Sequence, residues 1–210
     1  MLHRLSQRVP FSLDPASEYY KMVKFVYDKS LVLTPDEVNI AKTWGDIHGN
    51  YNGSSHFTNV LTQLIKKEKV DLFGAAELYA KHGIAIQDAS IVIFKAKYEY
   101  NGIRPISVIR AVFPGAENWN TLIPTPPYPE YLSAHAVIAF ACSEVLKDKF
   151  GSKYSFTDYM HETLYGVRSY KSFQEYAREA AWSRILAGIH YDPTAIASEK
   201  VGKDIGKLVN

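Results

Sequence analysis

Ten residues near the middle of the chain join a proline-rich entry to a serine and a histidine. Proline fixes φ and lacks an N–H donor, so no helix begins before the last of these prolines. Ser133 is then a candidate N-cap, and His135 falls in the first helical turn. Helix N-termini bind anions, so the stretch predicts an oxyanion site with His135 as its proton-transfer partner. Taken alone, it more often marks an ordinary capped loop. The stretch is Pro126-Pro127-Tyr128-Pro129-Glu130-Tyr131-Leu132-Ser133-Ala134-His135.

Two further groups of residues contain the cations, hydroxyl and histidine that an oxyanion site needs. Lys97 is followed, after six intervening residues, by Arg104 and a proline. Ser183 and Arg184 are followed, after five intervening residues, by His190. If the three groups converge, their cations match the oxygens of an anion with two or three negative charges. Two histidines let one attack or coordinate the central atom while the other moves a proton.

Predicted helices must position these groups. Helix starts are indicated by Asp14 before a proline, by the capping box of Thr34 and Glu37, and by a serine at 54 or 55. Asp71 caps a helix that continues to about residue 98 and carries Lys97. The segment 91–94 is strand-like in composition, but we assign it to this helix because the helical period continues through it.

The second half of the chain predicts three more helices. One begins at Ser133 and ends before Gly151. Another begins at a second capping box, Ser172 with Glu175, and runs to about His190, which places Ser183 and His190 on one face about 100° from Arg184. The last spans roughly residues 194–208. No stretch shows sustained strand alternation. The sequence therefore predicts an all-α, compact helical bundle with residues 1–210 as one domain.

Bulk composition narrows the classes of function. The 210 residues carry a net charge of +2, and no lysine/arginine run indicates a nucleic-acid partner. No apolar stretch is long enough to span a bilayer, and the first residues lack the apolar core of a signal peptide. We therefore expect a soluble chain, and the sequence does not indicate its cellular compartment. The single cysteine, Cys142, lies in an apolar run and is predicted to be a core residue.

The ordered pattern Lys-x6-Arg-Pro, Pro-x-Ser-x-His and Ser-Arg-x5-His resembles the signature of a known superfamily. That superfamily joins type 2 phosphatidic acid phosphatases, bacterial class A acid phosphatases and vanadium-dependent haloperoxidases. The resemblance covers about Ile84 to Asn210. Residues 125–131, Trp119 and residues 168–173 look most like the soluble, haloperoxidase-related branch. The chain is short for that branch, which is consistent with a natural minimal form or with the C-terminal part of a longer architecture.

The resemblance implies a role for each matched residue. Lys97, Arg104 and Arg184 would neutralise the equatorial oxygens of vanadate or phosphate, and Ser133 and the N–H of Ala134 would donate to the anion. His135 would be the acid/base group. In a haloperoxidase, His190 would be the axial ligand of vanadium and the residue that contacts the metal. In a phosphatase, it would be the nucleophile that forms a phosphohistidine. The implied reaction is vanadate-dependent oxidation of halide by hydrogen peroxide; the alternative is a phosphomonoesterase that needs no cofactor. A homodimer is compatible with both.

Two positions depart from the family pattern. Ala134 stands where glycine is common, so its methyl group could crowd the anion. Thr194 stands where an aspartate usually orients the axial histidine, four residues after it. A non-catalytic anion-binding or interaction protein is therefore a third alternative. A metal-hydrolase interpretation from Asp46 and His48, or from the pair 161–162, lacks spacing for a third ligand.

Overall fold

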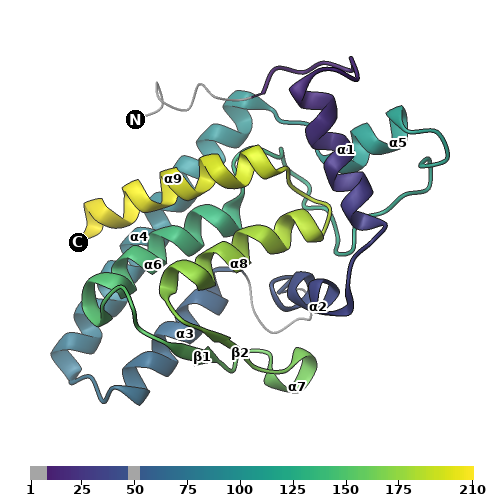
Figure 1. The fold of residues 1–210 in the computed structure, drawn as a ribbon. Coiled ribbons are helices and arrows are strands. Elements are labelled where there is room, and N and C mark those ends of the chain that lie inside the picture. The colour runs from purple at the N-terminus through teal and green to yellow at the C-terminus, as the bar shows by residue number, and fades with distance from the viewer. Residues whose placement is uncertain (1–8, 47–52) are drawn as a thin grey trace.

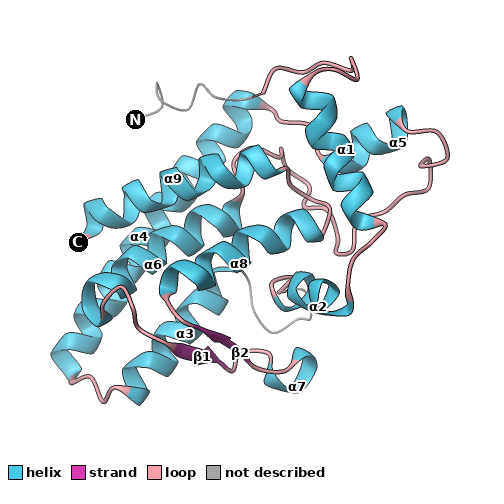
Figure 2. Ribbon diagram, in the orientation of Figure 1, coloured by secondary structure: helices cyan, strands magenta, loops and turns pink. Residues whose placement is uncertain are grey.

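The computed structural model describes residues 9–46 and 53–210, and it is predominantly helical, as predicted (Figures 1 and 2). A two-stranded antiparallel sheet, in which Phe156 pairs with Tyr170, is the addition to the predicted all-α architecture. The elements in chain order are α1 (Glu18–Ser30), α2 (Pro35–Thr43), α3 (Gly53–Lys67), α4 (Leu72–Tyr100), α5 (Pro105–Val112), α6 (Ala134–Phe150), β1 (Phe156–Asp158), α7 (Glu162–Tyr165), β2 (Arg168–Tyr170), α8 (Phe173–Leu186) and α9 (Asp192–Val209).

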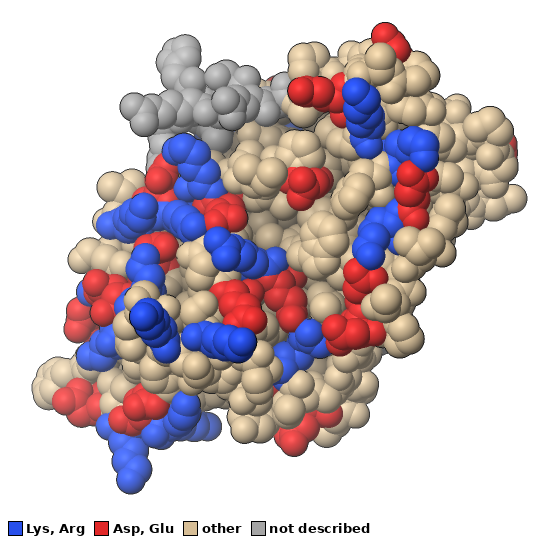
Figure 3. Space-filling model, in the orientation of Figure 1, with Lys and Arg blue, Asp and Glu red and all other residues tan. Residues whose placement is uncertain are grey.

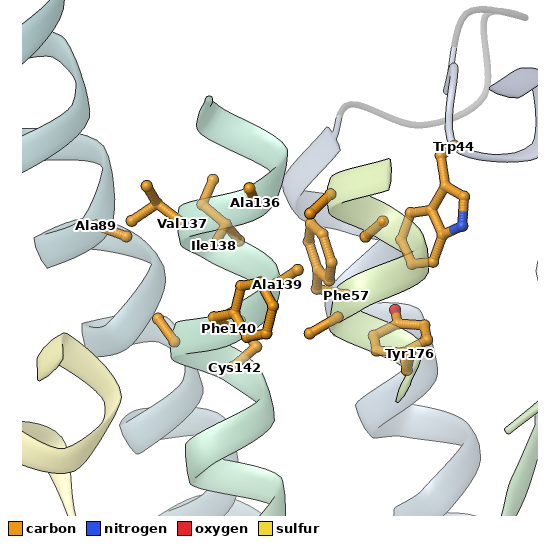
Figure 4. Close-up of a cluster of buried hydrophobic side chains, with 14 of the residues drawn as sticks. Trp44, Phe57, Ala89, Ala136, Val137, Ile138, Ala139, Phe140, Cys142 and Tyr176 are labelled. Atoms are coloured by element: carbon orange, nitrogen blue, oxygen red, sulfur yellow. The ribbon is translucent and has the colours of Figure 1, made fainter. Parts of the chain in front are cut away.

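Helix α6 is the centre of the bundle. Its residues 136–146 are all buried, which is the pattern of a helix that is covered on every side. It packs against α9, α8 and α4. Figure 4 shows its side chains between Ala89 of α4 and the aromatic rings of Trp44, Phe57 and Tyr176. Cys142 lies in this core as a free, buried thiol, as predicted. Because Ser133 is the N-cap of α6, the packing of this helix fixes the position of the predicted oxyanion site.

Several helix boundaries differ from the sequence prediction. Helix α1 begins at Glu18 with Ser17 as its N-cap, whereas Asp14 forms the turn before it and accepts hydrogen bonds from the N–H groups of Ala16 and, through its carbonyl, Ser17. The capping box of Thr34 and Glu37 is confirmed in α2. The N-cap of α4, Asp71, is also confirmed, and residues 91–94 are helical. Pro105 begins α5, a short helix that the sequence analysis did not assign.

The prediction that α8 continues to about His190 is wrong. The helix ends at Leu186, and Gly188 turns the chain with a φ of +78°. A side chain at Gly188 would meet the ring of Trp119 at 2.9 Å. His190 therefore lies in the link between α8 and α9, and it shares no helix face with Ser183. The Ser183 hydroxyl instead donates to the carbonyl of Ala180 within α8.

The described helices include none that is long and apolar enough to cross a membrane. Acidic and basic side chains alternate over the face that Figure 3 shows, without a large region of one sign. This surface agrees with the small net charge of +2. It offers no support for a nucleic-acid partner on that face.

Glycine permits the close contact between α6 and α9. A Cβ atom at Gly202 would lie 2.4 Å from the carbonyl oxygen of Val137. We expect Gly202→Ala to lower the free energy of unfolding by about 1–3 kcal/mol, because two packed helices would have to separate. Urea unfolding measures this. Gly83→Ala is the matched control, because its Cβ meets nothing within 4 Å and alanine favours the helix. Equal stability of wild type and Gly202→Ala would contradict the close packing.

Candidate functional site

The structure brings most of the predicted site residues to one cavity. The cavity has a volume of about 250 Å³ and opens beside the N-terminus of α6. Ala134 and His135 enter from α6, Arg184 from α8, and His190 from the link that follows α8. Asp46 and Tyr128 complete the polar part of the lining. Segments from four separate parts of the chain therefore meet at the predicted oxyanion site.

Arg104 supports the cavity from behind. Its Nε donates to the carbonyl of Tyr128 at 2.9 Å, and its Nη1 donates to the carbonyl of Ile189 at 2.9 Å. The same Nη1 lies 3.2 Å from Nε2 of His190. Its Nη2 is buried and has no hydrogen-bond partner among the described residues. Arg104 thus holds two loops together and keeps one donor available beside His190.

Lys97 is fully buried, and its ammonium group makes three hydrogen bonds to the proline-rich stretch. It donates to the carbonyls of Pro129, Glu130 and Leu132 at 2.8, 3.0 and 2.5 Å. Burial and the nearby Arg104 charge lower the pKa of Lys97. Since an ammonium has three donors, this geometry uses all of them on the loop. In this structure Lys97 orders the backbone that leads to Ser133 rather than pointing a donor into the cavity.

Arg184 lines the cavity, and Ser133 directly precedes the lining residue Ala134. Nε and Nη2 of Arg184 and Oγ of Ser133 are buried without a partner among the described residues. Ser133 occupies the N-cap position of α6, as predicted, but its hydroxyl makes no capping hydrogen bond. Burial lowers the pKa of Arg184 to about 10, which still leaves it charged at neutral pH. Buried donors without acceptors cost free energy, so this arrangement favours an incoming anion.

Ala134 retains the backbone geometry that an anion site needs. It is the first residue of α6 and has the ordinary negative φ of a helix, so its place does not require glycine. Its methyl group lies at the cavity wall. The expected effect of Ala134 is therefore limited to the space around the anion, and its backbone N–H is one of the free groups of the first helical turn.

A buried glutamate takes the place of the missing aspartate. Oε1 of Glu130 lies 2.7 Å from Nδ1 of His190, and the N–H of Tyr191 donates to the same oxygen at 3.3 Å. The Thr194 hydroxyl donates to Oε2 at 3.0 Å. The carboxylate thus accepts the Nδ1 proton and leaves Nε2 of His190 as the atom with a lone pair. Thr194, which interrupts the family pattern, serves to hold Glu130.

Electrostatics keep His190 neutral. Burial, followed by the charges of Arg104, Lys97 and Arg184, lowers its pKa well below the usual value. Burial raises the pKa of Glu130, while hydrogen bonds from Thr194 and Tyr191 and the nearby cations oppose that rise. A neutral imidazole with a lone pair on Nε2 can coordinate or attack a central atom. In this structure that lone pair faces Nη1 of Arg104 at 3.2 Å, so a bound central atom would take the place of this contact.

His135 has a second carboxylate as its partner. Its Nε2 lies 3.3 Å from Oδ2 of Asp46, which follows α2. Burial and the Arg184 charge lower the pKa of His135 to about 4, and Asp46 acts in the opposite direction. His135 is therefore a neutral imidazole at pH 7, oriented by a carboxylate and lining the cavity. This is the placement that a proton-transfer group requires.

Sequence reasoning missed Glu130 and the pairing of Asp46 with His135. Glu130 stands inside the proline-rich stretch, but no local spacing connects it to a histidine 60 residues later. The one feature of the sequence that could have indicated Glu130 is an acidic residue among prolines and tyrosines. Asp46 was considered as a metal ligand with His48, which lies outside the described residues.

Known proteins share this architecture. The family described as the VCPO second helical-bundle domain matches residues 77–210. A solved structure of "the first bacterial vanadium dependant iodoperoxidase" is 34% identical, with a TM-score of 0.90 over 97% of this chain and 52% of that chain. A holo-type bacterial vanadium-dependent chloroperoxidase is 20% identical, with a TM-score of 0.76 over 99% of this chain and 50% of that chain, which shows the fold alone. The chain thus spans about half the length of these structures. A comparison with curated proteins gives no match.

Proposed function

Because the chain belongs to the vanadium haloperoxidase/acid phosphatase superfamily, we propose that it binds vanadate and oxidises a halide with hydrogen peroxide. The observation that carries the proposal is the set of buried donors without partners among the described residues: Nη2 of Arg104, Nε and Nη2 of Arg184, and Oγ of Ser133. Arg184 lines the cavity together with His135 and His190. Arg104 and Ser133 lie next to lining residues, since Nη1 of Arg104 is 3.2 Å from Nε2 of His190 and Ser133 directly precedes Ala134. Arginine forks and a hydroxyl match the oxygens of a tetrahedral or trigonal-bipyramidal oxyanion.

The charge of the site also fits such an anion. Lys97, Arg104 and Arg184 are buried cations, and Glu130 is the buried carboxylate among them. Fixed cations in a water-poor site stabilise negative charge strongly, because they need no reorganisation when the charge develops. The site residues therefore fit vanadate, and they would hold it through Arg104, Arg184, Ser133 and Nε2 of His190.

The protein's residues would divide the work of the reaction. Bound vanadate would supply Lewis-acid activation of hydrogen peroxide without a change in oxidation state. His135, neutral at pH 7 and backed by Asp46, would accept a proton from incoming peroxide and return it to the leaving oxygen. The overall balance is one halide, one hydrogen peroxide and one proton giving one hypohalous acid and one water. Arg104 and Arg184 would hold the anion in place throughout.

Phosphomonoester hydrolysis is the second candidate, and one observation favours it. Glu130 binds Nδ1 of His190 at 2.7 Å, which makes Nε2 a better nucleophile toward phosphorus. In that reaction His190 would form a phosphohistidine, and the alcohol would leave with the proton of the monoanionic phosphate ester. Water would then release phosphate, with neutral His135 accepting a proton from it. The donors named above bind phosphate oxygens as well as those of vanadate.

One set of assays separates the candidates. The purified chain is titrated with vanadate and tested for iodide and bromide oxidation with peroxide, and in parallel for hydrolysis of an aryl phosphate. We expect vanadate binding and halide oxidation, both abolished in His190→Ala. His82→Gln is the matched control, because this buried histidine on α4 lies outside the cavity. Phosphate release instead would support the second candidate. Vanadate binding without either reaction would indicate an anion-binding protein, and absence of binding would contradict the proposed site.

A further inference from the structure

A second cluster of side chains lies against the outer side of Asp46. Oδ1 of Asp46 is 3.1 Å from Nδ1 of His56 and 3.0 Å from Nε2 of His161. These three atoms all lie within 4.8 Å of one another. Asp46 follows α2, His56 belongs to α3, and His161 precedes α7. Three segments thus each place one potential ligand atom within 4.8 Å of the other two.

Two buried carboxylates share the buried imidazole of His56 in this cluster. Nε2 of His56 faces a second carboxylate, Oδ2 of Asp158, at 2.7 Å. The side chains of Asp46 and Asp158 are 2% and 3% exposed, and that of His56 is fully buried. One imidazole therefore stands between two buried carboxylates. Even when it is protonated on both nitrogens, the three groups keep one net negative charge. A divalent cation with a neutral His56 would balance both carboxylates.

We propose that Asp46, His56 and His161 bind one zinc ion, at a site that shares only Asp46 with the oxyanion cavity. Two imidazole nitrogens and one carboxylate oxygen are a common ligand set for zinc, with a fourth position left to solvent. The His161 side chain is 10% exposed, so the cluster has a path to solvent on that side. Magnesium and calcium prefer sites built from oxygen ligands alone.

The surroundings of the cluster have the second layer of contacts that metal sites use. Asp158 holds Nε2 of His56, and its own Oδ1 accepts the N–H of Met160 at 2.9 Å. A carboxylate behind a ligating histidine fixes the ring and raises its basicity. Asp46 has a φ of +48°, which turns this residue out of the ordinary backbone path toward the histidines. The ligand set is thus held by contacts beyond the ligands themselves.

Zinc would connect this cluster to the oxyanion cavity through one carboxylate. Oδ1 of Asp46 faces His56 and His161, while Oδ2 faces His135. A metal on Oδ1 would leave Oδ2 in place for His135. It would also tie Asp46 to α3 and to the segment between β1 and β2. The site would accordingly stabilise the wall of the cavity and fix the partner of His135.

Zinc binding by the full chain tests the proposal without any vanadate. Chelator-treated protein is titrated with zinc or with magnesium, and stoichiometry and the thermal unfolding midpoint are measured. We expect one zinc per chain and a higher midpoint with zinc, and no such rise with magnesium. Cobalt(II) should give the visible absorption of a tetrahedral site. Asp158→Asn should lower zinc affinity about 10- to 100-fold.

Two variants and a control decide the outcome. His161→Gln should lose the zinc-dependent rise and the cobalt spectrum, and His56→Gln should do the same; His161 is nearer the surface and is the variant expected to fold normally. His82→Gln, a buried histidine outside the cluster, should bind zinc as the wild type does. Wild type that binds no zinc, or His161→Gln that binds it unchanged, would overturn the metal site and leave a protonated His56 between two carboxylates. Neither result depends on whether the oxyanion cavity binds vanadate.

Discussion

Glu130→Gln is expected to weaken vanadate binding about 10- to 100-fold, which is the usual effect of removing the carboxylate behind a metal-bound histidine. In the wild type, Oε1 of Glu130 lies 2.7 Å from Nδ1 of His190. Glutamine keeps the shape of the side chain and an oxygen that can accept the same hydrogen bond. It removes the negative charge, however, and with it part of the basicity of Nε2. Vanadate titration at several pH values measures the change.

A second buried glutamate provides the control. Glu144 on α6 is 3% exposed and forms an ion pair with Lys147, away from the cavity. Glu144→Gln should leave vanadate affinity unchanged. Thr194→Val should weaken vanadate binding less than Glu130→Gln, because it removes one of the hydrogen bonds that hold the carboxylate. Unchanged affinity in Glu130→Gln would show that Glu130 has a structural role only, and that the family's missing aspartate has no substitute here.

Local patterns explain which parts of the fold were predictable. Capping residues such as Thr34, Asp71 and Ser172 accept a hydrogen bond from an N–H three residues away, so their helices could be located from the sequence. The end of α8 also had a local signal, which the prediction did not use: Gly188 follows the C-cap with a φ of +78°, the usual place of glycine after a helix. The ring of Trp119, distant in the sequence, leaves no room for a side chain there.

The site was predictable to the extent that its signature is local. His135, Arg184 and His190 belong to short ordered patterns, and the structure places all three at one cavity. Glu130 and His56 act through contacts that only the folded chain creates, across 60 residues to His190 and across 102 residues to Asp158. His56, a ligand of the proposed zinc site, could therefore not be predicted from the sequence. Glu130, from another segment, makes the contact with Nδ1 of His190 that the resemblance leads us to expect of an acidic residue at position 194.

Arg184→Met should have opposite effects on binding and on stability. Nε and Nη2 of Arg184 are buried without partners among the described residues, so the unliganded protein carries the cost of a desolvated cation. Replacing that cation by an apolar side chain of similar length should leave the thermal midpoint without anion unchanged or higher. Vanadate affinity should fall about 100-fold, since two charge-assisted hydrogen bonds of about 1.5 kcal/mol each are lost.

Arg168→Met is the matched control with the reverse expectation. Arg168 forms two hydrogen bonds with Glu179, at 2.6 and 2.7 Å, outside the cavity. Its removal leaves Glu179 without that partner, so the midpoint should fall while vanadate affinity stays the same. Thermal unfolding of Arg184→Met and Arg168→Met, each with and without vanadate, gives the four midpoints that test these expectations. A lower midpoint for anion-free Arg184→Met would mean that this arginine supports the fold. The buried donors would then be no evidence for an anion, because their cost would be offset within the protein itself.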